Sequence, residues 1–130
     1  MIVVDSSVWI SYFHRTATPA VERLRAITRT DDILVGDVMM LEILQGARSE
    51  EVARALETEL RTFTIVSMLS DAVAVSAARY YRLLRAEGIT VRKTPDLIIA
   101  AYCIDHGHAV LHQDRDFDHF ERRLGLKIVH

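Results

Sequence analysis

The stretch Thr94–Phe117, TPDLIIAAYCIDHGHAVLHQDRDF, predicts a helix, a strand and an acidic turn in close succession. Pro95 suits the first turn of a helix, Thr94 is expected as its N-cap, and Gly107 is a typical helix end. The run Ala109–His112 then predicts a short buried strand. A helix followed directly by such a strand is the repeating unit of a parallel sheet, so this stretch indicates an α/β fold.

The rest of the chain repeats the alternation of short strands and helices. Strands are expected at Met1–Val4, Ile33–Val35 and Thr64–Val66, with Lys127–Val129 as an edge strand. Helices are expected at Ser6–Phe13, Pro19–Thr28, Asp37–Ala47 (with Asp37 as N-cap), Ser49–Phe63, Ser70–Glu87 and Phe117–Leu124. Short connections between such elements predict a central parallel sheet of four to five strands with helices on both faces.

Length and composition predict a single domain over residues 1–130. Half of the 130 residues are hydrophobic and 26% are charged, which is typical of a globular protein and not of a disordered chain. The one cysteine, Cys103, cannot form an internal disulfide, and this fits a reducing cytoplasm. The apolar run Leu97–Ile104 is too short to span a bilayer, so no membrane partner is expected.

Acidic residues stand at several points where a parallel sheet binds its ligands, beyond the carboxyl ends of the strands. Asp5 follows the first strand, Asp114 and Asp116 follow the strand at 109–112, and Asp96 lies in the first turn of a helix. Glu42 is set in an apolar run, where a buried carboxylate is costly without a partner. Each has a structural alternative: a helix cap for Asp5, a dipole contact for Asp96, and a narrow polar stripe for Glu42.

Taken together, these acids predict a metal site. Asp5 and Asp114 are expected at the same edge of neighbouring strands, with Asp96 and Glu42 on helices that face this edge. Close carboxylates repel each other by several kcal/mol per pair at an effective dielectric constant of about 20, so such a cluster requires cations. Oxygen-only ligands favour Mg²⁺ or Mn²⁺, and Mg²⁺ held in this way is typical of enzymes that act on phosphates.

Three segments, MIVVDSSVWISYF, LEILQGAR and the stretch quoted above, resemble the PIN-domain ribonucleases, and among them the VapC toxins of bacterial toxin–antitoxin pairs. Their order and spacing agree over the whole chain. The resemblance implies an α/β/α sandwich with its active site at the carboxyl edge of the sheet. The family's acidic quartet is matched by Asp5, Glu42, Asp96 and Asp114. A further acid of the family is matched by Asp116, and its pair of hydroxyl residues by Ser6 and Ser7.

His112 departs from the family pattern, because the family often has Thr or Ser at this position. An imidazole there could bind phosphate or take no part, so its role stays open. The resemblance further implies a Mg²⁺-dependent endoribonuclease, with Mn²⁺ able to substitute. It also implies a homodimer and a small VapB-type antitoxin whose C-terminal segment covers the active site.

The net charge of −2 conceals an uneven distribution. Residues 94–121 carry six acids against Arg115 alone, while residues 79–93 carry five bases against Glu87. Basic segments beside an acidic centre suit an RNA backbone held next to a metal site. Arg92, Lys93 and Arg115 are the expected RNA contacts, and a solvated helix face is the alternative for any one of them.

Two other functions compete with this interpretation. An inactive PIN-like module that only binds RNA or protein would gain nothing from clustered buried acids. Another Mg²⁺-dependent α/β phosphohydrolase, such as a receiver domain, would need an acid pair or a nucleophilic Asp after the first strand, commonly with a lysine on a late strand. This chain has Asp5-Ser6-Ser7 after the first strand and no lysine before Lys93, which argues against this alternative. Six histidines allow a zinc site, but the single cysteine and the absence of paired ligand spacing argue against it.

Overall fold

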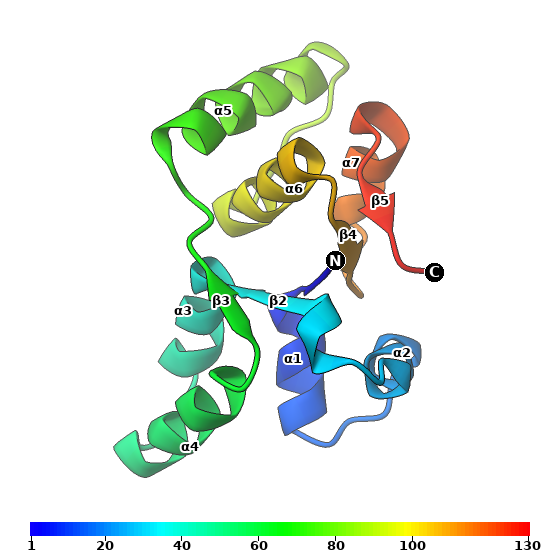
Figure 1. Cartoon of the computed structure of the whole chain (residues 1–130). Coiled ribbons are helices and arrows are strands. Elements are labelled where there is room, and N and C mark those ends of the chain that lie inside the picture. The colour runs from blue at the N-terminus through cyan, green and yellow to red at the C-terminus, as the bar shows by residue number, and fades with distance from the viewer.

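The computed structural model describes residues 1–130 and has a five-stranded parallel sheet at its centre (Figure 1). The strands run in the order β3-β2-β1-β4-β5, and every neighbouring pair is parallel. Their bounds are β1 Ile2–Val4, β2 Ile33–Gly36, β3 Thr64–Val66, β4 Ala109–Leu111 and β5 Lys127–Ile128. The predicted sheet and its edge strand are therefore confirmed.

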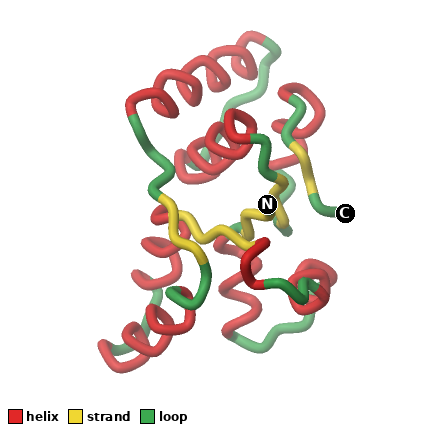
Figure 2. The backbone as a smooth tube through the Cα atoms, in the orientation of Figure 1, coloured by secondary structure: helices red, strands yellow, loops and turns green.

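Helices lie on both sides of this sheet, as Figure 2 shows. On one side lie α1 (Ser6–Phe13), α2 (Pro19–Ala26), α3 (Asp37–Gln45) and α4 (Glu50–Leu60). On the other lie α5 (Asp71–Ala86), α6 (Thr94–His106) and α7 (Phe117–Leu124). A single 3₁₀ turn, Thr30–Asp32, leads into β2. The arrangement is the predicted α/β/α sandwich. None of these helices has the length and apolar character that crossing a membrane requires.

Two predicted helix caps are wrong. Gly36, not Asp37, is the N-cap of α3, because Asp37 is already the first residue of the helix. The Asp37 carboxylate accepts a hydrogen bond from the Met68 amide at 3.0 Å and so holds the segment after β3. Lys93, not Thr94, is the N-cap of α6, and no side chain caps this helix. Other ends differ by one to three residues: the helix expected over residues 49–63 ends at Leu60, where a turn leads into β3.

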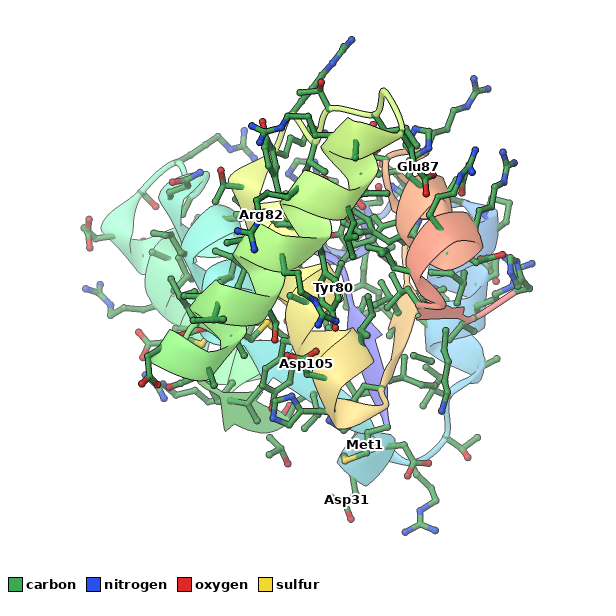
Figure 3. All side chains as sticks on the ribbon, turned by 90° about the horizontal axis from the view of Figure 1, so that it is seen from above. Met1, Asp31, Tyr80, Arg82, Glu87 and Asp105 are labelled. Atoms are coloured by element: carbon green, nitrogen blue, oxygen red, sulfur yellow. The ribbon has the colours of Figure 1, made fainter.

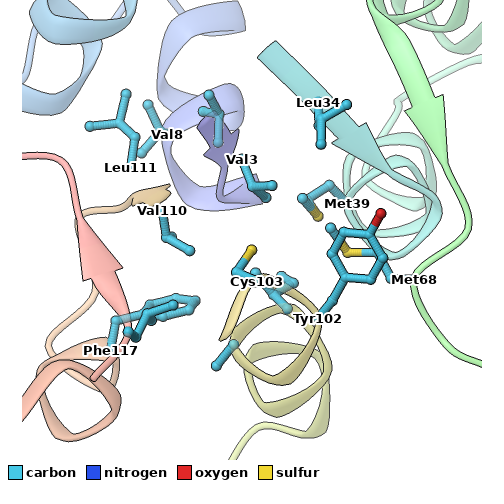
Figure 4. Close-up of a cluster of buried hydrophobic side chains, with 14 of the residues drawn as sticks. Val3, Val8, Leu34, Met39, Met68, Tyr102, Cys103, Val110, Leu111 and Phe117 are labelled. Carbon is cyan, nitrogen blue, oxygen red and sulfur yellow. The ribbon is translucent and has the colours of Figure 1, made fainter. Parts of the chain in front are cut away.

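The core fills the space between the middle strands and the helices on either side. Figure 4 shows Val3 of β1 and Val110 of β4 facing Cys103 of α6, with Met39 and Met68 close by. All five side chains are fully buried. Strands covered on both faces need apolar residues at every position, which explains the short uninterrupted apolar runs in the sequence. Burial also raises the pKa of the Cys103 thiol to about 12, so this cysteine is unreactive.

The strand order places a crevice between β1 and β4. The chain moves from β1 outward to β2 and β3, then returns past β1 to form β4 and β5 on the other side. The connections therefore diverge at the carboxyl ends of β1 and β4, and open α/β sheets bind ligands at such a point. Asp5 and Asp114 lie just beyond these two strand ends.

Candidate functional site

Asp5 begins the site at the carboxyl end of β1, where it is also the N-cap of α1. Its amide donates to the carbonyl of Leu111 at 2.9 Å, which ties this residue to the end of β4. One carboxylate oxygen accepts hydrogen bonds from the amide and the hydroxyl of Ser7. The residue is 3% exposed, and its other oxygen, Oδ1, has no hydrogen-bond partner.

Two further acids reach this crevice from helices. Asp96, in the first turn of α6, is 5% exposed, and its Oδ2 has no hydrogen-bond partner. Glu42, on α3, is half-buried and accepts a hydrogen bond from the Ser6 hydroxyl at 3.1 Å. The two hydroxyls expected beside Asp5 therefore have separate partners, since Ser6 holds Glu42 and Ser7 holds Asp5.

Asp114 and Asp116 lie on the loop from β4 to α7. The Asp116 amide donates to Asp114 Oδ1 at 3.0 Å, and Lys93 Nζ donates to Asp114 Oδ2 at 2.7 Å. The Asp114 amide in turn donates to His112 Nδ1 at 3.1 Å, while the His112 ring stacks on Phe117 with 4.9 Å between the ring centroids. His112 thus shapes the backbone that carries Asp114, a contact that its position in the sequence did not indicate.

The carboxylates of Asp96, Asp114 and Asp116 form a cluster with the geometry of a cation site. Each offers one oxygen, and these three oxygens lie within 4.8 Å of one another. The unpartnered buried oxygens of Asp5 and Asp96 point to the same chemistry, because a buried polar atom without a partner is costly unless a ligand satisfies it. The donors are all carboxylate oxygens, so the residues present fit a hard divalent cation.

Electrostatic coupling joins the acids of the site. Burial, together with the charges of Asp5 and Asp114, raises the pKa of Asp96 to about 7. Burial likewise raises the pKa values of Asp5 and Glu42. Burial also acts to raise the pKa of Asp114, but hydrogen bonds from Lys93 and from the Asp116 amide outweigh it and lower that pKa. Shifts of this kind at a strand-end crevice are typical of functional sites.

The three basic residues expected to contact RNA have different surroundings. Lys93 is exposed at the edge of the acidic site, where its ammonium group contacts Asp114 and offsets part of the negative charge there. Arg92 lines a cavity beside the acidic cluster. Arg115 lies between Asp114 and Asp116 with an exposed side chain that makes no hydrogen bond or ion pair.

Gln113 is a residue of the site that sequence reasoning missed. Its amide nitrogen donates to the Ser7 carbonyl at 3.1 Å and to the Ser11 hydroxyl at 2.8 Å, and its oxygen accepts from the Thr18 hydroxyl at 2.9 Å. These bonds fasten the loop that carries Asp114 to α1 and to the start of α2. An exposed glutamine between two loop residues gives no pattern that predicts such contacts.

Comparisons with known proteins agree with this fold and site. Residues 2–123 match the family described as PIN domain. A curated relative named VapC ribonuclease Mb1587, from Mycobacterium bovis, is 33% identical over 130 residues, which cover 98% of this chain and 96% of that protein.

Two solved structures show the same fold. VapBC2 from Rickettsia felis, bound to a DNA fragment from its promoter, matches with a TM-score of 0.79 at 16% identity, covering 99% of this chain and 98% of that chain. VapBC-5 from Mycobacterium tuberculosis, a member of the VapBC family of toxin-antitoxin systems, matches with a TM-score of 0.66 at 22% identity, covering 98% and 96%. The family match and the curated relative, each spanning nearly the whole chain, show that this protein belongs to the PIN-domain family and, within it, to the VapC ribonucleases.

Proposed function

We propose that this protein is the toxin of a type II toxin–antitoxin pair and hydrolyses RNA phosphodiester bonds with Mg²⁺, for which Mn²⁺ substitutes. The observation that carries the proposal is the acidic site at the ends of β1 and β4, where buried carboxylate oxygens have no partner. Membership of the VapC ribonucleases supplies the reaction class. The acidic site supplies the groups that this reaction needs.

Each acid has a role that follows from its position. Asp96, Asp114 and Asp116 would hold the cation, and Asp5 would join them directly or through water. A bound divalent cation lowers the pKa of its water and polarises the phosphate. Glu42, held by Ser6, would orient the attacking water. Attack in line with the leaving 3′-oxygen leaves a 5′-phosphate and a 3′-hydroxyl, so preference for RNA must come from binding and not from the ribose 2′-hydroxyl.

The expected partner is a small VapB-type antitoxin. The solved structures of similar fold are VapBC assemblies, which supports this choice. The antitoxin's C-terminal segment is proposed to cover the acidic site, and the toxin is proposed to be a homodimer. The cytoplasm, where RNA is available and Cys103 stays reduced, is the proposed location.

Purified protein freed of antitoxin should cleave cellular RNA with Mg²⁺ or Mn²⁺ and stop when EDTA is added. Replacing Asp5 with Ala should abolish both cleavage and growth arrest, because the cation site loses a buried ligand. Gel analysis of RNA and growth after induction measure the two effects. The matched control is Asp31→Ala, which changes an exposed aspartate of the 3₁₀ turn outside the acidic site and should remain fully toxic. A folded Asp5→Ala variant that still arrests growth would refute the assignment.

Replacing Glu42 with Ala should remove RNA cleavage while leaving folding intact or improved. Its carboxylate is partly buried near Asp5, and burial raises its pKa, so its removal relieves a charge that the fold disfavours. Thermal unfolding followed by circular dichroism, in parallel with the cleavage assay, separates the two effects. A variant that unfolds at a much lower temperature would instead assign Glu42 a structural role.

A further inference from the structure

A cavity of about 460 Å³ opens beside the acidic cluster, between the loop that follows α5 and the start of α7. Residues 88–92 of this loop form one wall, and Asp116 and His119 form the other. Asp116 also belongs to the acidic cluster with Asp96 and Asp114. Because the cavity and the cluster share this side chain, a ligand in the cavity lies directly next to the group bound at the cluster.

The walls of the cavity are held in place by the surrounding fold. Gly88, with a φ of 82°, ends α5 in the left-handed conformation, and the Ile89 amide returns to the Leu84 carbonyl at 2.9 Å. Ile89 and Val91 pack against the hydrophobic core. An ion pair of 3.0 Å between Glu87 and Arg123 joins the end of α5 to α7. The cavity therefore exists before any ligand arrives, as is usual for small-ligand sites.

Two side chains of the lining are free to bind a ligand. Arg92 and His119 are both exposed, and neither makes a hydrogen bond, an ion pair or an aromatic contact within the protein. A guanidinium and an imidazole both present flat faces, and proteins that bind single-stranded RNA stack its bases on such groups. The apolar side chains of Ile89 and Val91 add a surface that suits the face of a base.

The volume of the cavity and the Asp116 carboxylate in its wall favour a base over a phosphate. The volume lies within the range of about 300–1,000 Å³ that is typical of sites for small organic groups. The Asp116 carboxylate at the end nearest the cluster repels a free phosphate, whereas the amino groups of bases can donate hydrogen bonds to an acid. The phosphate would instead bind at the acidic cluster, where a bound cation would attract it.

We propose that this cavity binds the base of a single-stranded RNA nucleotide that flanks the scissile phosphate, stacked on Arg92 and His119. The proposal rests on the proposed ribonuclease function and adds to it a site that reads one base. Arg92 and His119 then supply affinity for a base through stacking, and the Asp116 carboxylate favours a base that carries an amino group.

Binding to short single-stranded oligoadenylate, oligocytidylate and oligouridylate tests the proposal, with an abasic chain of the same length as reference. The protein carries Asp5→Ala, so that RNA is not cut, and fluorescence anisotropy reports affinity in the presence of Mn²⁺. We expect at least one of the three oligonucleotides to bind about five- to a hundredfold more tightly than the abasic chain. Adding Arg92→Ala and His119→Ala should remove this advantage while affinity for the abasic chain changes much less.

The matched control is Arg82→Ala, which removes the same charge from the outer face of α5, where Figure 3 labels it. This change should leave the preference for bases intact. Equal affinity for all four chains, or a loss in the double variant that is the same for every chain, would overturn the base site. If the protein without the Asp5→Ala change cuts no RNA but the base preference is still measured, the ribonuclease proposal is refuted and the base-binding proposal stands.

Discussion

The Asp96→Asn variant should cut RNA more than about a hundredfold more slowly than the parent protein, yet be more stable when metal is absent. The loss of activity follows from the loss of a charged oxygen in the cluster with Asp114 and Asp116. The gain in stability follows because the ionised Asp96 carboxylate is disfavoured in the folded protein. Its residue is 5% exposed, and the charges of nearby acids repel it. Asparagine keeps nearly the same shape without the charge.

The pH dependence of this gain has a definite sign. The pKa of Asp96 rises from an ordinary value of 3.8 to about 7 in the folded protein, so between these values the folded state binds more protons than the unfolded state. Stability contributed by this group is therefore complete at low pH and is lost as the pH rises through about 7. The Asp96→Asn variant has no carboxyl group to titrate here and does not lose this stability. The difference in free energy of unfolding between variant and parent should therefore grow up to neutral pH and then level off.

Denaturant unfolding in EDTA, repeated at a series of pH values, measures this advantage, which should reach about 4 kcal/mol, since the pKa rises by about three units. Adding Mn²⁺ should stabilise the parent protein much more than the variant, because a ligand stabilises only the state that binds it. Asp31→Asn, on an exposed turn, is the control and should change neither quantity. A variant that is less stable than the parent at every pH would show that the Asp96 charge is already satisfied within the protein.

Replacing Trp9 with Ala should produce a large loss of stability, about 3–5 kcal/mol in the free energy of unfolding. Trp9 is 1% exposed and joins α1 to the turn before β3. Its ring lies 5.2 Å from Phe63 and 5.8 Å from both Tyr12 and Phe13, measured between centroids. Alanine would leave a cavity among these rings. Because α1 also carries Ser6 and Ser7, the loosened helix should weaken the site as well.

A milder change at the same position separates packing from hydrogen bonding. The Trp9 indole N–H is buried without a partner, so Trp9→Phe removes an unsatisfied donor along with some volume and should cost far less than Trp9→Ala. Val75→Ala on α5, where the side chain is 71% exposed, should change stability by less than about 0.5 kcal/mol. Urea denaturation monitored by circular dichroism gives all three values. A loss below about 1 kcal/mol for Trp9→Ala would contradict this view of the core.

Most of the fold could be predicted because the local signals agree with the tertiary structure. Strands buried on both faces must be apolar throughout, and the three central strands β1, β2 and β4 show this directly. Gly107 ends α6 with a φ of 74°, a conformation that its lack of a side chain permits. The predicted caps at Asp37 and Thr94 are each one residue too late, because these two residues already belong to the helices and the N-caps are Gly36 and Lys93. The Asp37 carboxylate also bonds the Met68 amide, a contact with a distant residue that no local pattern encodes.

The acids of the site could be expected together because they lie at strand ends and in a helix turn that meet at one edge. Their detailed contacts could not. The bond from Lys93 to Asp114 and the three bonds of Gln113 join residues between 21 and 106 positions apart, and no local pattern encodes them. Ser6 donates a hydrogen bond to Glu42, whereas Ser7 donates to Asp5. The first of these bonds likewise depends on how α3 packs beside α1.

The chemical nature of the new RNA ends tests the central claim most directly. Cleavage carried out with Mn²⁺ in ¹⁸O-labelled water, followed by mass spectrometry, should give products with one ¹⁸O in a 5′-phosphate and an unmodified 3′-hydroxyl. The same products should be missing with EDTA and with the Asp5→Ala variant, because under the proposed mechanism the acids and their cation would activate the water that attacks the phosphorus. Products that end in a 2′,3′-cyclic phosphate, or cleavage that persists in EDTA, would contradict the account.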